Sequence, residues 1–243
     1  MKIALQLYSL RNIMTTPEDY LAVFPKLKAL GYDGVEFAGY KGLSAEILRK
    51  ALDDAGLVAV GAHIGVGDFA PEKMADTIAF HKTLGMTHIG VGGADHKTKE
   101  RAAVSCAAMK AASELAAKDG ITIYYHNHRE EFWPYPDGTL AIDMFLDACV
   151  CQIDTYWSFV GGADNAAFLP AHANRIWTYH IKDGTKDGSK GLPLGRGEND
   201  LQTVLSCAKA AGLEWIIVED EQHEPGKEFD DIKIDADFLK ANL

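Results

Sequence analysis

Four short polar segments in the C-terminal half of the chain carry the residue types that could do chemistry. Each closes an apolar, β-rich run: residues 125–128 (YHNH), 152–154 (QID), 179–182 (YHIK) and 218–220 (VED). Successive parallel strands of a barrel bring their C-terminal ends together around one mouth, so residues far apart in sequence can converge there. The imidazoles and carboxylates of these segments suit a divalent metal ion. The sequence therefore predicts a metal site at such a mouth.

The elements that would position these segments alternate regularly along the chain, as expected of repeated βα units. The predicted strands cover residues 3–7, 34–37, 57–63, 87–91, 121–125, 150–153, 176–181 and 215–218. The predicted helices cover about residues 16–30, 44–54, 71–85, 97–118, 140–148, 163–172, 201–211 and 231–243. Thr16 before Pro17, and Gly31 after Leu30, are typical start and stop signals of a helix. The pattern predicts an α/β fold, a (β/α)8 TIM barrel.

Length and composition limit the domain organisation and the partners. The 243 residues, 47% of them hydrophobic, would fill one barrel or two small domains. No linker or change of composition divides the series, so we expect one domain over residues 1–243. The formal net charge of −11 would repel a polyphosphate backbone, which excludes nucleic acid as an expected partner.

The first residues and the hydropathy of the chain indicate where the protein works. The N-terminal segment has no long apolar core followed by a cleavage site of small residues. No run approaches the roughly 20 apolar residues that are needed to cross a bilayer. We therefore expect a cytoplasmic protein without a membrane partner.

Six segments, in the same order along nearly the whole chain, resemble the xylose isomerase-like TIM barrels. They are residues 31–36 (GYDGVE), 125–128 with 131–132 (YHNH, EF), 154–157 (DTYW), 180–183 (HIKD), 195–198 (GRGE) and 218–220 (VED). More narrowly, the chain is similar to the sugar phosphate isomerase/epimerase branch of that superfamily. A single barrel supports many chemistries, so the substrate does not follow from the resemblance.

The resemblance implies one divalent cation, commonly manganese, cobalt, magnesium or zinc, held by residues that end strands five to eight. In this chain those positions are His126, Asp154, His180 and Glu219. Independently of any family, two imidazoles and two carboxylates suit Mn²⁺, Co²⁺, Fe²⁺ or Zn²⁺ better than Ca²⁺.

The chain departs from its resemblance at one ligand position. Relatives that epimerise free ketoses carry glutamate where this chain has His126, and two glutamates there exchange a proton on opposite faces of the substrate carbon. Glu219 is therefore the first candidate base, followed by His128, Glu36 and Glu131. His128 shares the strand face of His126, since side chains two apart on a strand project the same way.

The candidate substrate-binding residues share a position at or beside the predicted mouth: Tyr8, His63, Trp157, Lys182 and Arg196. An ammonium at Lys182 could stabilise an enediolate or hold a sugar oxygen. The indole of Trp157 could stack on a sugar ring. Arg196 lies in a glycine-rich segment, residues 183–200, whose basic side chains could meet an anionic group.

Structural roles compete with each of these interpretations. Asp154 and Glu219 could cap the helices that follow them. His126 and His128 could be core histidines bonded to neighbouring carbonyls, and Glu36 could be part of a structural ion pair. The glycine-rich segment could be an ordinary surface loop.

Together these residues predict a divalent-metal-dependent isomerase or epimerase that acts on a sugar or keto-sugar derivative through an enediol or enolate. Two alternatives stay open. One is a metal-dependent lyase or hydratase acting on a keto-glycoside or inosose. The other is a non-catalytic sugar-binding barrel that serves as a subunit of another protein. A homo-oligomer is compatible with either, because barrel helices often pair.

Overall fold

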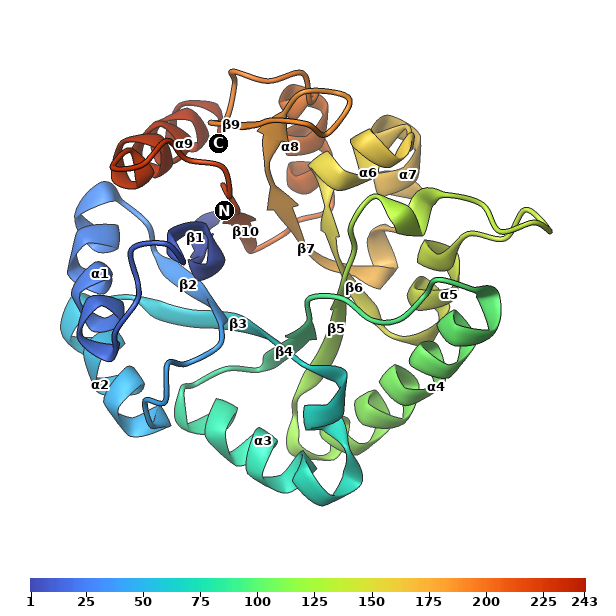
Figure 1. Ribbon diagram of the computed structural model, residues 1–243, viewed down its shortest axis with the longest axis horizontal. Helices are drawn as coiled ribbons and strands as arrows, with labels where there is room; N and C mark the ends of the chain where they lie inside the picture. The colour runs from blue at the N-terminus through green and yellow to red at the C-terminus, as the bar shows by residue number, and fades with distance from the viewer.

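The computed structural model describes residues 1–243 and has at its centre a closed barrel of eight parallel strands (Figure 1). The strands are β1 Lys2–Gln6, β2 Gly34–Ala38, β3 Val58–Ile64, β4 His88–Val91, β5 Thr122–His126, β6 Val150–Asp154, β7 Ile176–Ile181 and β10 Trp215–Val218. The barrel closes where β1 pairs with β10, with Lys2 opposite Trp215. Each predicted strand overlaps one of these, so the predicted TIM-barrel fold is confirmed.

Nine α-helices surround the strands in Figure 1. They are α1 Pro17–Leu30, α2 Ala45–Ala55, α3 Pro71–Thr83, α4 Lys99–Ala116, α5 Ala141–Ala148, α6 Thr155–Gly161, α7 Asn165–Ala171, α8 Leu201–Ala210 and α9 Glu228–Asn242. The predicted signals operate at α1: Thr16 and Asp19 form a capping box, and Gly31 ends the helix with a φ of 97°. The short α6, which follows β6 without a break, was not predicted from the sequence. None of the nine helices combines the length and the apolar character that a membrane crossing requires.

The hydrophobic core lies in two places. The larger part, 55 buried residues, packs between the outer face of the barrel and the helices. A small cluster of Ala4, Val60 and Ile217, with Trp177 and Trp215 packed against it, fills the N-terminal part of the barrel interior. Towards the C-terminal end the interior is polar instead, and Gln6, Gln152 and His180 are fully buried there. The polar residues that could form a site therefore lie in the interior of the barrel, at its C-terminal end.

The segment after β7 is anchored to the barrel by one carboxylate. It contains a short antiparallel pair, β8 Asp183–Gly184 and β9 Gly191–Leu192. The Asp183 carboxylate accepts backbone N–H bonds from Gly184 (2.8 Å), Gly195 (3.0 Å), Gly197 (2.9 Å) and Asn199 (3.1 Å). A Cβ at residue 197 would lie 2.2 Å from Asp183 Oδ1, so the close approach of this backbone to the carboxylate requires glycine. These bonds favour a fixed loop over a mobile lid.

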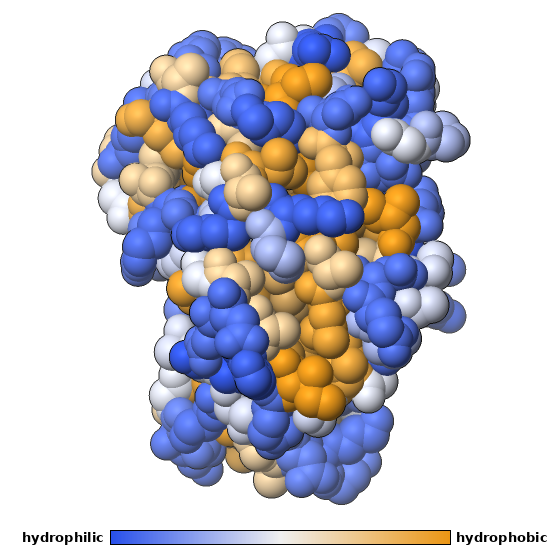
Figure 2. Space-filling model, turned by 90° about the vertical axis from the view of Figure 1, so that its left-hand side faces the viewer, coloured by the Kyte–Doolittle hydropathy of each residue, from blue (hydrophilic) through white to orange (hydrophobic).

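The outer surface of the barrel is mixed in polarity. Figure 2 looks onto the side that carries α1 and α2 in Figure 1, where hydrophilic residues surround a hydrophobic patch. Apolar patches with a polar rim occur where proteins associate. The predicted homo-oligomer stays a prediction.

His88 provides a test of the N-terminal end of the barrel. Its ring stacks on Trp177 with the centroids 4.1 Å apart, and burial lowers the pKa of His88 to about 4. In the unfolded chain His88 binds a proton as the pH falls through about 6.5, whereas in the folded chain it does so only near pH 4. The free energy of unfolding therefore decreases as the pH falls from about 6.5 to about 4. The loss is at most about 3 kcal/mol in the free energy of unfolding. His88→Gln should flatten that part of the pH profile measured by denaturant unfolding, and an unchanged slope would contradict this account.

Candidate active site

Four potential metal ligands converge at the C-terminal end of the barrel. His126 and Asp154 are the last residues of β5 and β6, His180 lies in β7, and Glu219 directly follows β10. One donor atom from each lies within 4.8 Å of the others, and all four side chains are buried. The structure thus brings together the four residues predicted as ligands, as parallel strands in a barrel should.

The two carboxylate oxygens of Asp154 have different surroundings. Oδ1 accepts the backbone N–H groups of Tyr156 at 2.9 Å and Trp157 at 2.8 Å, which caps α6. Oδ2 is buried and has no hydrogen-bond partner. Burial raises the pKa of Asp154 to about 6. A buried oxygen without a donor is costly, and a cation among the neighbouring donors would satisfy it.

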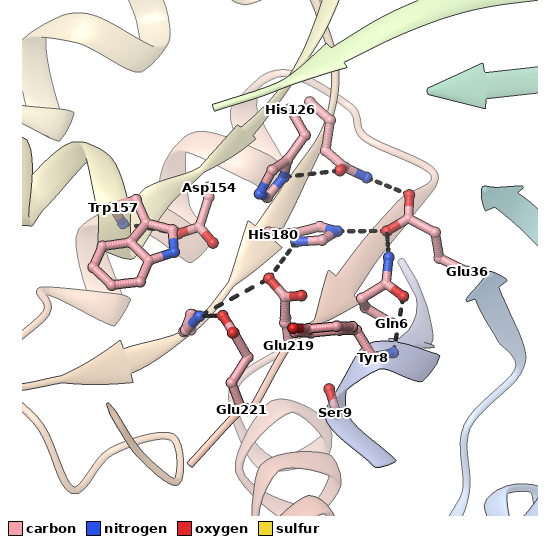
Figure 3. A network of polar contacts seen from close by, with 12 residues as sticks. Gln6, Tyr8, Ser9, Glu36, His126, Asp154, Trp157, His180, Glu219 and Glu221 are labelled. Atoms are coloured by element: carbon pink, nitrogen blue, oxygen red, sulfur yellow. Dashed lines mark hydrogen bonds and ion pairs between the residues drawn. The ribbon is translucent and has the colours of Figure 1, made fainter. Parts of the chain in front are cut away.

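His180 lies between two carboxylates, as Figure 3 shows. Nε2 is 2.6 Å from Glu36 Oε2, and Nδ1 is 3.3 Å from Glu219 Oε2. Burial alone would lower the pKa of His180, but Glu36 and Glu219 raise it to about 10. When Nε2–H donates to Glu36, loss of the other proton leaves Nδ1 free to bind a metal, the usual arrangement of a ligating histidine.

Gln152 orients His126, the other imidazole among the potential ligands. Its Oε1 accepts from His126 Nδ1 at 3.1 Å and from His63 Nε2 at 2.8 Å, while its Nε2 donates to Glu36 Oε1 at 2.7 Å. His126 Nε2 is therefore free to ligate. Burial, with His180 next in effect, lowers the pKa of His126 well below its ordinary value, which keeps the ring in the neutral, ligating form.

Glu36 supports the ligands and does not reach the mouth. Oε1 accepts from Tyr124 Oη at 2.5 Å as well as from Gln152, and Oε2 accepts from Gln6 Nε2 at 2.7 Å as well as from His180. Its side chain is fully buried. Burial favours the neutral form, but His63 and His180 lower the pKa of Glu36 to about 2. Its oxygens are all engaged, so the structure does not present this predicted base to a substrate.

Glu131, another predicted base, is also fully buried away from the mouth. Its oxygens accept from Tyr125 Oη at 2.6 Å and from the backbone N–H of His128 at 3.1 Å. Tyr125 stacks on Phe145 of α5, on the outer side of the barrel wall. Glu131 therefore holds the segment after β5 in place.

A cavity of about 320 Å³ adjoins the cluster and is lined by Tyr8, Ala38, His63, Gly92, His126, His128, Glu219 and Glu221. Its volume is near the lower end of ordinary small-molecule sites. A larger cavity of about 600 Å³ lies between α7 and α8, but its lining is mainly apolar and distant from the cluster. We locate the site at the smaller cavity because the polar groups converge there.

Lys182 and Glu221 form an ion pair beside the ligands. Lys182 Nζ contacts Glu221 Oε1 directly and lies 4.0 Å from Glu219 Oε2. Burial would lower the pKa of Lys182, but Glu219, Glu221 and Asp154 together raise it. Glu221 was not predicted as a site residue, although its position two residues after Glu219 indicates that the two side chains share a face.

Of the predicted substrate contacts, Tyr8 and His63 line the cavity, whereas Lys182, Trp157 and Arg196 lie outside its lining. The Trp157 ring packs against Lys182, with Nζ 4.8 Å from its centroid, and its Nε1 is buried without a partner. Arg196 is exposed on the loop after β9, where its guanidinium makes no polar contact.

The charges of the site favour a cation. The carboxylates of Glu36, Glu219 and Glu221 pair with the basic groups of His180 and Lys182, and the Asp154 carboxylate lies in the same cluster. Such an excess of buried negative charge is stabilised by a bound divalent ion. The mixed nitrogen and oxygen donors suit a first-row transition metal or magnesium.

Comparisons with known proteins agree with this architecture. A family model described as xylose isomerase-like TIM barrel matches residues 24–242. Two structures of a sugar phosphate isomerase/epimerase from Parabacteroides distasonis are 24% and 25% identical, with TM-scores of 0.84 and 0.83. The matches cover 99% and 98% of this chain and 93% and 97% of those chains. A structure of L-ribulose 3-epimerase is 16% identical with a TM-score of 0.76, covering 100% of this chain and 95% of that one. No protein of curated function matches in sequence.

Asp154→Asn should weaken metal binding without unfolding α6. The asparagine Oδ1 can still cap the helix, but the amide nitrogen in place of Oδ2 cannot ligate. We expect the affinity of this four-residue site for Mn²⁺, measured by calorimetry on chelator-stripped protein, to fall by more than about 100-fold, beyond the loss typical of a residue that only orients a ligand. Asp164→Asn, which alters the exposed cap of α7, is the matched control and should bind normally. Equal affinity in the two variants would remove Asp154 from the ligand set.

Gln152→Met should weaken metal binding indirectly. The variant leaves the His126 and His63 N–H groups and one Glu36 oxygen with fewer partners. We expect a fall of roughly 10–100-fold in Mn²⁺ affinity and a loss of about 1–3 kcal/mol in the free energy of unfolding. Calorimetry and denaturant unfolding measure the two effects, with the exposed Gln202→Met as control. Unaltered affinity in the folded variant would show that the imidazoles need no such support.

Proposed function

Because the chain belongs to the xylose isomerase-like TIM-barrel family, we propose that it is a divalent-metal-dependent isomerase or epimerase of a sugar or keto-sugar derivative, working through an enediol or enolate. The observation that carries the proposal is the unpartnered Asp154 Oδ2, which lies among three further donors beside a small cavity. The neighbours solved as sugar isomerases and epimerases support a sugar as the substrate class.

His126, Asp154, His180 and Glu219 would hold the ion. The donor set is compatible with Mn²⁺, Co²⁺, Mg²⁺, Fe²⁺ or Zn²⁺, and manganese is the first ion to test. When bound, the cation supplies polarisation of a substrate carbonyl or hydroxyl.

Glu219 is the best placed proton acceptor. It lines the cavity, and its Oε1 accepts no hydrogen bond from the protein. Burial would raise the pKa of Glu219, but Lys182 and His180 hold it below its ordinary range. Glu219 is therefore a carboxylate at neutral pH, able to take a proton from the carbon next to a carbonyl.

Lys182 and His128 are the candidate partners of Glu219. Lys182 remains an ammonium between two carboxylates, so it can donate a hydrogen bond to the oxygen on which negative charge develops. His128 lines the same cavity, and its imidazole carries both a hydrogen-bond donor and an acceptor nitrogen when neutral.

Elimination is the second candidate reaction, favoured by the placement of two carboxylates. Glu36 and Glu131 are both buried and engaged elsewhere, so neither can act opposite Glu219. A lyase or hydratase acting on a keto-glycoside or inosose needs only one carboxylate, because loss of a leaving group replaces return of the proton. The same base serves both candidates.

Hydrogen exchange tests the proposal. We expect metal-loaded protein to introduce deuterium from heavy water into the carbon next to the carbonyl of one of a panel of ketoses, aldoses and keto-glycosides, followed by NMR. Glu219→Gln at saturating Mn²⁺ should bind that sugar but lose exchange by about 100-fold or more, the scale of a general base. The exposed Glu224→Gln is the control and should exchange normally.

The products separate the candidate functions. Exchange with an isomeric sugar supports isomerisation, and an unsaturated product supports elimination. Unchanged exchange in Glu219→Gln rejects its base role. Sugar binding without exchange on any compound in the panel would favour the non-catalytic barrel.

A further inference from the structure

A second group of potential metal ligands lies on the segment that leads from β10 into α9. Asp220 directly follows Glu219, His223 lies three residues later, and Asp231 is in the first turn of α9. Their donor atoms lie within 4.8 Å of one another. His223 Nδ1 is 3.0 Å from Asp231 Oδ2 and 3.7 Å from Asp220 Oδ2. Bonds of about 2.1 Å to one ion would place neighbouring donors roughly 3 to 3.5 Å apart, close to this spacing.

Asp220 supplies an independent sign that a ligand belongs here. Its side chain is 5% exposed, and Oδ2 is buried without a hydrogen-bond partner. Asp220 Oδ2 faces His223 Nδ1, which is also the atom that contacts Asp231. A buried carboxylate oxygen without a donor is costly unless a cation satisfies it.

His223 is held in the orientation and tautomer that a metal needs. Its side chain is 1% exposed, and Nε2 lies 3.1 Å from the carbonyl oxygen of Ser9. A carbonyl only accepts, so Nε2 carries a hydrogen and Nδ1 can present its lone pair to Asp220 and Asp231. Histidines that ligate metals usually donate their other N–H to such a carbonyl or carboxylate.

The surrounding charge is negative. Asp235, one turn after Asp231 on α9, is fully buried and also has an oxygen, Oδ2, without a partner. Neither Lys nor Arg forms an ion pair with Asp220, Asp231 or Asp235, and His223 is the sole basic side chain paired with the first two. Two carboxylates and an imidazole suit Zn²⁺, Mn²⁺, Fe²⁺ or Co²⁺ better than Ca²⁺.

We propose that Asp220, His223 and Asp231 form a second divalent-cation site, distinct from the four-ligand site inside the barrel. A cation there clips the segment after β10 to the first turn of α9 and, through His223, to the backbone at Ser9. This segment also carries Glu221, which pairs with Lys182 and lines the cavity. A cation bound at the second site would therefore hold one side of the cavity in place.

Metal stoichiometry tests the second site independently of the first. Chelator-stripped wild type, Asp154→Asn, His223→Gln and the double variant are titrated with Zn²⁺ and, separately, with Mn²⁺. Calorimetry and elemental analysis after dialysis measure the bound ions. We expect Asp154→Asn to retain one ion per chain and the double variant to retain none. The retained ion should also raise the Tm of Asp154→Asn by roughly 5 °C or more at 100 times its Kd.

Two results would overturn the proposal. One is a folded Asp154→Asn that binds neither ion, in which case the hydrogen bond between His223 and Asp231 accounts for the cluster without a metal. The other is a double variant, Asp154→Asn with His223→Gln, that still binds one ion per chain. If His223→Gln does not fold, the partly exposed Asp231→Asn replaces it and should lower the affinity at least about 10-fold. Asp230→Asn, next to it and paired with Lys227, is the matched control and should change nothing.

Discussion

The buried carboxylate of Glu36 is the interaction on which the polar interior of the barrel depends. From β2 it accepts hydrogen bonds from Gln6 of β1, Tyr124 of β5, Gln152 of β6 and His180 of β7. A buried charge is tolerated only when it is fully hydrogen-bonded, so these strands must keep their register for the barrel to close around it. In turn, Glu36 orients His180, and Gln152, which is bonded to Glu36, orients His126. These are the two imidazoles of the proposed metal site. The same interaction thus supports the fold and prepares the site.

In most of the proposed metal ligands, the two polar atoms of the side chain have different surroundings. One oxygen of Asp154 caps α6 and the other has no protein partner; one nitrogen of His180 donates to Glu36 and the other faces Glu219. In the proposed site, Asp154, His126 and His180 would each be held by the atom that does not ligate, which lowers the entropic cost of ordering the site. A structural role and the proposed ligand role are therefore compatible at Asp154 and His180.

The sequence was sufficient for the barrel and for the residues that end its strands, because strand period and helix caps are local signals. It was insufficient for Glu36 and Glu131, whose types and positions suggested bases, because engagement by Tyr124 and Tyr125 depends on distant packing. The strand register shifts at Val35/Glu36 and at Cys151/Gln152. The alternation of side chains along a regular strand therefore could not predict the contact between Glu36 and Gln152. The short α6 was missed for a local reason, since its cap is also the end of a strand.

The segment after β10 shows how one strand end can serve two sides of the barrel wall. Side chains alternate along extended backbone, so Glu219 and Glu221 line the cavity while Asp220 turns towards α9. On the cavity side the segment is restrained by Lys182, and on the other by His223 and Asp231. Displacing it towards either side would separate a buried charge from its partner, which is costly in a low-dielectric interior. The position of Glu219, the proposed base, is therefore set as much by the residues behind the wall as by those inside the barrel.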